Sequence, residues 1–165
     1  GEAENEFKDL IEKTGIPSAW TILGLSALPT DHYLNVGMVG MHGNYGPNVL
    51  TNECDLLIAI GMRFDDRVTG NLESYAKQAK IIHMEIDPAE INKNVECDVP
   101  VIGNIKETIP LLLSMVNKNS HKKWLDKFNS FLVGPKTTWL FEIKKSLISF
   151  PIPLELPVIK TFILS

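Results

Sequence analysis

The sequence has 165 residues, of which 44% are hydrophobic and 22% charged, values typical of a folded domain and not of a disordered or fibrous chain. Its net charge is −4 and its densest basic patch is only His121 to Lys123, so nucleic acid is not an expected partner. Cys54 and Cys97 lie far apart and predict neither a zinc site nor a disulfide framework, and no apolar run is long enough to span a membrane. We expect a cytoplasmic globular protein and, because residue 1 is Gly, a piece of a longer chain.

Apolar patterns alternate between helix and strand along the first half of the chain. Helical spacing of Phe7, Leu10 and Ile11 is followed by a helix-ending Gly15. The run CDLLIAIG is continuous, as in a strand that is buried on both faces. We expect helices over 4–14 and 48–53, strands over 16–23 and 54–61, and loops over 24–32 and 38–46.

The same alternation continues in the second half. Asp87 followed by proline, and Asn104 followed by a glutamate at the third position, are signals that begin helices, although Pro110 is expected to delay or kink the second one. We expect further helices over 72–79, 105–118 and 121–131, and strands over 80–86 and 99–103. This order predicts an α/β fold with a Rossmann-like, doubly wound parallel sheet.

The character of the sequence changes near Leu132. The stretch 131–165 is apolar and rich in proline, and it has no clean helical or strand period. We therefore expect a domain over 1–130 and an atypical tail over 131–165. The tail is either an edge strand with a docking segment or sequence foreign to the domain, such as a shifted-frame end, and we favour the second interpretation.

Ligands of open parallel sheets bind beyond the carboxyl ends of the strands. The loops expected there are 61–70, 85–90 and 103–107. Arg63 suits a phosphate, and Glu85 or Asp87 suits ribose hydroxyls. A purely structural interpretation is that Asp87 and Asn104 only cap helices, and that Arg63, Asp65, Asp66 and Arg67 form ion pairs among themselves.

The loop 39–46 has closely spaced glycines but lacks both the G-x-G-x-x-G order and a phosphate-loop motif. His42 has no nearby cysteine, serine nucleophile or second histidine at ligand spacing, so we assign it no catalytic or metal role. His83 is expected to be a core histidine. No residue of this chain is predicted to be catalytic or to bind metal.

Four stretches of the sequence nevertheless resemble a known family in their order and spacing. They are GIPSAWTILGLSALPTDH, GMVGMHGNYGPNVLTNECDLLIAIGMRFDDRVTG, AKIIHMEIDPAEINKN and DVPVIGN. They resemble the central domain of the catalytic subunit of acetolactate synthase, a member of the thiamine-diphosphate enzymes. The resemblance covers residues 4–130, and GMRFDDRVTG and GMHG are the stretches most specific to that family.

The resemblance implies that the complete enzyme condenses two pyruvates, or pyruvate with 2-oxobutyrate, at the start of branched-chain amino-acid synthesis. Thiamine diphosphate and Mg²⁺ would be held by flanking domains that this sequence lacks, so the chain alone is expected to be inactive. A homodimer of catalytic subunits with a regulatory small subunit is also implied. In the family an inner strand precedes this domain, so the sheet here is expected to be truncated at its N-terminal strand, with two exposed edges.

Within the family the central domain binds FAD, which has no redox role in the synthase reaction. Carried over by motif, the FAD contacts are Thr21, Ile22, Val39, Gly40, Met41, His42, Gly61, Met62, Arg63, Phe64, Asp65, Glu85, Ile86, Asn104 and Ile105. The family usually has Asp in place of Asn104, and more often Asp than Glu at position 85. Met41, Asp66 and Arg67 would line the channel to the thiamine site.

Two other functions compete with this interpretation. The chain could be a non-catalytic interaction piece that docks on a synthase subunit or a regulatory partner. A nicotinamide dehydrogenase is disfavoured, because no G-x-G-x-x-G follows a strand.

Overall fold

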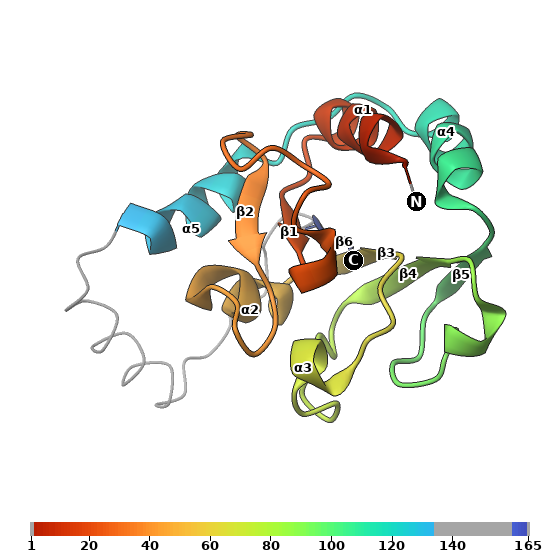
Figure 1. Cartoon of the computed structure of the whole chain (residues 1–165). Coiled ribbons are helices and arrows are strands. Elements are labelled where there is room, and N and C mark those ends of the chain that lie inside the picture. Colours follow the sequence, from red (N-terminus) through yellow and green to blue (C-terminus); the bar gives the residue numbers. More distant parts are fainter. Residues whose placement is uncertain (1, 134–159, 165) are drawn as a thin grey trace.

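A computed structural model describes residues 2–133 and 160–164 of the chain (Figure 1). Its described strands form one sheet in the order β2-β1-β6-β3-β4-β5, and all neighbours pair in parallel. The strands are β1 (Ser18–Trp20), β2 (Asn35–Met38), β3 (Leu56–Ile60), β4 (Lys80–Glu85), β5 (Val99–Ile102) and β6 (Lys160–Leu164). The predicted parallel α/β sheet is confirmed.

Helices cover both faces of this sheet. On one face α1 (Glu4–Thr14) and α4 (Ile105–Met115) lie side by side (Figure 1). On the other face α2 (Tyr45–Thr51) packs against α5 (Lys122–Val133). Short helical turns follow three of the strands: η1 (Ile22–Gly24), α3 (Asp66–Thr69) and η2 (Pro88–Glu90).

The central strand β3 shows why the sheet is buried on both sides. Leu57 and Ala59 belong to the core on the α2 and α5 face, and Ile58 and Ile60 belong to the core on the α1 and α4 face. Successive side chains of a strand point to opposite faces, so an unbroken apolar run fills both cores. Each large side chain buried in this way contributes about 1.5–3 kcal/mol.

Two strands differ from the expectation. β2 was not predicted, because its sequence NVGM has neither an alternating pattern nor many β-formers, and its place is fixed by parallel pairing with β1. β1 itself is only three residues long, because Thr21 already begins the helical turn η1.

Two predicted helices are wrong. Residues 72–79 form successive turns, since Ala76 has φ +44°, which is incompatible with a continuous right-handed helix. The helix expected after Asp87 is only the single turn η2, although Asp87 does accept the predicted capping bond from the Ala89 N–H. In contrast, α1 has the predicted bounds and Gly15 ends it with φ +67°, and Pro110 does not delay α4.

The strand β6 belongs to the proline-rich tail. It lies between β1 and β3 as an inner strand of the described sheet, and so it is not the edge strand considered for the tail. The remainder of the tail, 134–159 and residue 165, lies outside the described residues, so the predicted domain boundary near 130 stays a prediction. None of the helices in the described part is long and apolar enough to cross a membrane.

Candidate functional site

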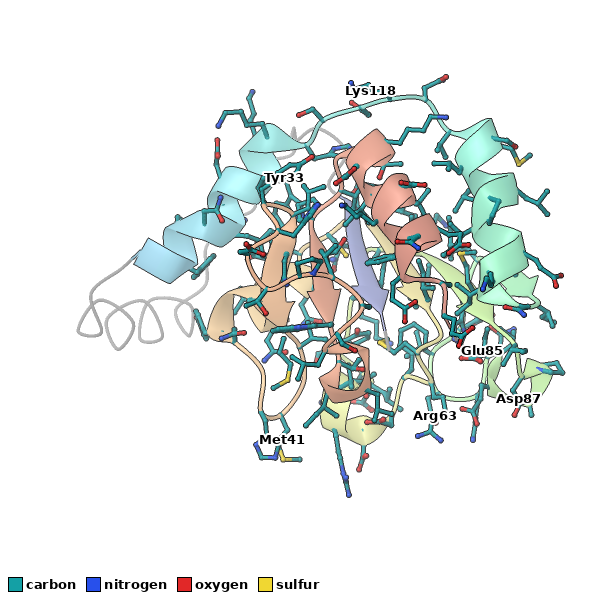
Figure 2. All side chains as sticks on the ribbon, turned by 45° about the horizontal axis from the view of Figure 1, so that its top comes forward. Tyr33, Met41, Arg63, Glu85, Asp87 and Lys118 are labelled. Atoms are coloured by element: carbon teal, nitrogen blue, oxygen red, sulfur yellow. The ribbon has the colours of Figure 1, made fainter. Side chains whose placement is uncertain are left out.

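A cavity of about 540 Å³ lies where β1, β2 and β3 end, at the carboxyl edge of the sheet. Figure 2 shows Met41, Arg63 and Glu85 along this edge, opposite Tyr33 and Lys118. The cavity brings together nine predicted flavin contacts: Thr21, Ile22, Val39, Gly40, Met41, His42, Met62, Arg63 and Asp65. The predicted channel residue Arg67 lines it as well.

The loop after β3 exposes Arg63 between two buried neighbours. Met62 and Phe64 are each only 1% exposed, and Arg63 between them is exposed. Gly61 and Phe64 both have positive φ, +63° and +53°, and for a phenylalanine this backbone conformation is strained. The two buried side chains hold that conformation, and the guanidinium is left at the surface of the cavity.

The four charged residues of this loop do not neutralise one another. In residues 2–131, whose side chains are described, no ion pair joins Arg63 or Arg67 to Asp65 or Asp66. Asp65 instead caps α3 by accepting a hydrogen bond of 3.0 Å from the Arg67 N–H. The alternative interpretation, in which these four charges form ion pairs with one another, is therefore wrong. Both guanidinium groups remain available to an anion.

The glycine-spaced loop after β2 is fixed closely against the loop after β3. The Met41 N–H donates to the Arg67 carbonyl at 2.6 Å, and the Asn48 amide bonds both the N–H and the carbonyl of Gly40. Gly40 has φ +102°, and a Cβ atom there would lie 2.8 Å from the Arg67 carbonyl oxygen. Only glycine fits this position without displacing the neighbouring backbone.

Thr21 contributes an unpaired hydroxyl at the end of β1. The residue is 4% exposed and its Oγ1 has no hydrogen-bond partner among the described residues. A buried hydroxyl without a partner is costly, and a ligand that bonds it removes that cost. The residues of the cavity thus fit an anionic ligand with further hydrogen-bonding groups, as FAD is.

Six predicted contacts do not line the cavity: Gly61 and the buried Phe64 lie in the loop after β3, and Glu85, Ile86, Asn104 and Ile105 lie further along the same edge. Glu85 ends β4 and its Oε1 accepts the Ile86 N–H at 2.8 Å, while Asn104 caps α4 by accepting the Lys106 N–H at 3.0 Å. Ile86 and Ile105 stand beside these two residues. Asp66 lines a second cavity of about 350 Å³, which it shares with Met41 and Arg67.

Three residues that line the 540 Å³ cavity were not predicted from the sequence: Leu23, Met38 and Val68. Leu23 and Val68 stand one position beyond predicted contacts, and Met38 ends the strand that was not predicted. Among the described residues no group of three or more His, Cys, Asp or Glu side chains is placed to hold a metal ion.

The sequence matches known proteins over most of its length. Residues 1–112 match the family described as thiamine pyrophosphate enzyme, central domain. An acetolactate synthase of Mycobacterium leprae (strain TN) is 50% identical over 116 residues, which are 70% of this chain and 19% of that protein. A probable acetolactate synthase large subunit of Methanocaldococcus jannaschii is 43% identical over 146 residues, 87% of this chain and 23% of that protein.

The relationship extends to plants. Acetolactate synthase 2, chloroplastic, of Nicotiana tabacum is 44% identical over 125 residues, which are 76% of this chain and 19% of that protein. The chain thus spans about a fifth of the length of these relatives.

Proposed function

Because this chain belongs to the family of thiamine pyrophosphate enzyme central domains, we propose that it is the central domain of an acetolactate synthase and that it binds FAD at the carboxyl edge of its sheet. The observation that carries the proposal is the 540 Å³ cavity, which is lined by Arg63 and Arg67, two arginines without ion pairs among the described side chains, and by Thr21, whose buried hydroxyl has no partner among the described residues. A ligand with phosphates and hydroxyl groups would satisfy all three.

Each part of the edge has a distinct task in this proposal. Arg63 binds the phosphates through its forked donors, and the glycine turn at Gly40 lets the ligand approach the backbone. Glu85 and Asn104 accept hydrogen bonds from ribose hydroxyls further along the edge. FAD itself supplies no redox step in the synthase reaction, so the chain's residues bind and orient it.

The activity of the complete protein is a wider proposal. It would condense two pyruvates, or pyruvate with 2-oxobutyrate, in the synthesis of branched-chain amino acids. Thiamine diphosphate and Mg²⁺ would be held by domains beyond this chain, and Met41, Asp66 and Arg67 would line the channel toward them. A homodimer with a regulatory small subunit, located in the cytoplasm, completes the proposal.

Titration of the chain with FAD tests the proposed site. We expect quenching of flavin fluorescence, with a dissociation constant raised at least about tenfold by Arg63→Ala, because a hydrogen bond to a charged group is lost. Lys118→Ala is the matched control, since it removes an equal charge from an exposed residue on the opposite side of the molecule (Figure 2). Absence of binding at high micromolar FAD, or an equal effect of both variants, would contradict the proposal.

A further inference from the structure

The buried His83 in the middle of β4 has one polar contact that leads directly to the proposed site. Its side chain is 0% exposed, and its Nε2 lies 2.7 Å from the carbonyl oxygen of Met62 in the loop after β3. A carbonyl oxygen only accepts hydrogen bonds, so Nε2 carries the proton and donates. His83 therefore holds the backbone of the residue immediately before Arg63.

The other ring nitrogen of His83 makes it energetically unfavourable to bury this side chain in the core. Nδ1 of His83 is buried and has no hydrogen-bond partner among the described residues. A purely apolar side chain would leave no such atom unsatisfied. The distinctive contribution of the imidazole is thus its bond to Met62.

The same ring also holds the residue on the other side of Arg63. The rings of His83 and Phe64 meet edge to face, with their centroids 4.9 Å apart and an interplanar angle of 75°. The Phe64 carbonyl accepts a further bond from the Asn94 side chain at 3.1 Å. His83 thereby restrains both neighbours of an exposed arginine, one by a hydrogen bond and one by ring packing.

We propose that His83 is a positioning residue for the proposed FAD site: it fixes the backbone of 62–64 so that Arg63 is presented to the cavity. The inference rests on the proposed function, because Arg63 is the residue it serves. Phe64 has φ +53°, a conformation that relaxes once its restraints are removed. His83 itself does not touch the ligand.

The test compares His83→Gln with His83→Met in the full chain. Both side chains have nearly the same length, but only glutamine carries an N–H that can reach the Met62 carbonyl. In FAD titrations we expect His83→Met to raise the dissociation constant about tenfold and His83→Gln to stay within about threefold of the unmodified chain. Equal weakening by both variants, or none by either, would overturn the proposal.

A double-variant cycle separates positioning from general stability. If His83 acts through Arg63, adding His83→Met to Arg63→Ala weakens FAD binding no further. Full additivity of the two effects would overturn the proposed route. Should His83→Met fail to fold, His83→Phe replaces it, since phenyl fills the ring volume and also lacks the donor.

Hydrogen exchange distinguishes a failure of this inference from a failure of the proposed function. In the ligand-free chain we expect the peptide over 61–68 to exchange faster in His83→Met than in His83→Gln, with the peptide over 7–16 unchanged in both. If the unmodified chain binds no FAD but this difference appears, the FAD proposal fails and the positioning role stands. If FAD binds and neither exchange nor affinity differs, the positioning role fails alone.

Discussion

The carboxyl and amino ends of the strands, here called the two edges of the sheet, each carry a cavity. The two cavities are similar in size but are lined by different groups. The carboxyl edge holds the 540 Å³ cavity, and a cavity of about 500 Å³ lies at the amino edge, before β4 and β5. At the amino edge several polar groups bond to the chain itself: Gln78 donates to the carbonyls of Asn52 and Cys54, and Asp98 accepts from Lys80 and from the Ile81 N–H. Cavity volume therefore does not identify the ligand site.

The carboxyl edge is characterised by two arginines without ion pairs in the described part of the chain and by two exposed apolar side chains. Arg63 and Arg67 form no ion pair among the described side chains, and Ile22 and Met41 beside them are each 69% exposed. At the amino edge Lys80 pairs with Asp98, and the buried Tyr75 hydroxyl has no hydrogen-bond partner among the described residues. Burial raises the pKa of Tyr75 far above its ordinary value, so its ring behaves as an apolar core group. The two arginines and the exposed apolar side chains, more than hollow space, make the carboxyl edge the candidate site.

The largest effect is expected from a glycine at the carboxyl edge. Gly40→Ala combines a positive φ with a Cβ placed 2.8 Å from the Arg67 carbonyl oxygen, and we expect it to lower the free energy of unfolding by about 3–5 kcal/mol and to abolish FAD binding. Gly70→Ala is the control: its φ is also positive, at +60°, but no atom lies within 4 Å of the added Cβ.

The control isolates backbone strain from steric overlap. Gly70→Ala should cost only about 1–3 kcal/mol, because with ψ −125° the residue lies outside the left-handed α region, and should leave FAD affinity unchanged. Urea denaturation followed by circular dichroism gives both free energies from the transition midpoints. Similar costs for the two variants would mean that the loops at Gly40 are not held as closely as their hydrogen bonds indicate.

A smaller effect, on stability alone, is expected at the amino edge. Gln78→Ala removes two hydrogen bonds, to the Asn52 and Cys54 carbonyls, and should cost about 1–2 kcal/mol while FAD affinity stays unchanged. Lys77→Ala, an exposed neighbour, should change neither quantity. A loss of FAD binding in Gln78→Ala would contradict the assignment of ligand binding to the carboxyl edge alone.

Local sequence signals were sufficient to predict those elements whose signal lies within a few neighbouring residues. The unbroken apolar run of β3 and the asparagine cap of α4 were both predicted, because each depends only on neighbouring residues. β2 and β6 were not predicted, since each is placed by pairing with β1, far away in the sequence. Parallel pairing leaves no short-range signature.

The candidate site was likewise predictable from the sequence only in part. The rule that ligands lie beyond the carboxyl ends of strands directed attention to the loop 61–70, part of which lines the 540 Å³ cavity. The sequence could not decide whether its charges pair with one another, because that depends on the backbone turn at Phe64 and on the bond from His83 to Met62. Met62 and Phe64 were predicted to contact the ligand, but His83, which bonds Met62 and packs on Phe64, had no predicted role in the site.

The smallest effect is expected from Asp98, which bonds Lys80 at 2.7 Å on the exposed amino edge. Hydrogen bonding to Lys80, then to the Ile81 N–H, lowers the pKa of Asp98, and the Asp98 hydrogen bond raises that of Lys80. The carboxylate's contribution is therefore present above its unfolded pKa of about 4 and is lost as the pH falls through the lowered folded value. The lysine's contribution is present below about pH 10.4 and is lost as the pH rises through its raised value.

Asp98→Asn removes both contributions, so its effect has a defined pH window. At pH 7 it should lower the melting temperature by no more than about 2 °C, since an exposed ion pair is largely screened by water. The difference from the unmodified chain should shrink below pH 4 and again above pH 10.4, and also in 0.5 M salt, while Asp31→Asn serves as the matched exposed control. A difference that stays constant across that window would show that charge pairing does not organise the amino edge. The hydrogen bond from the Ile81 N–H is no part of this test, because an asparagine oxygen can still accept it.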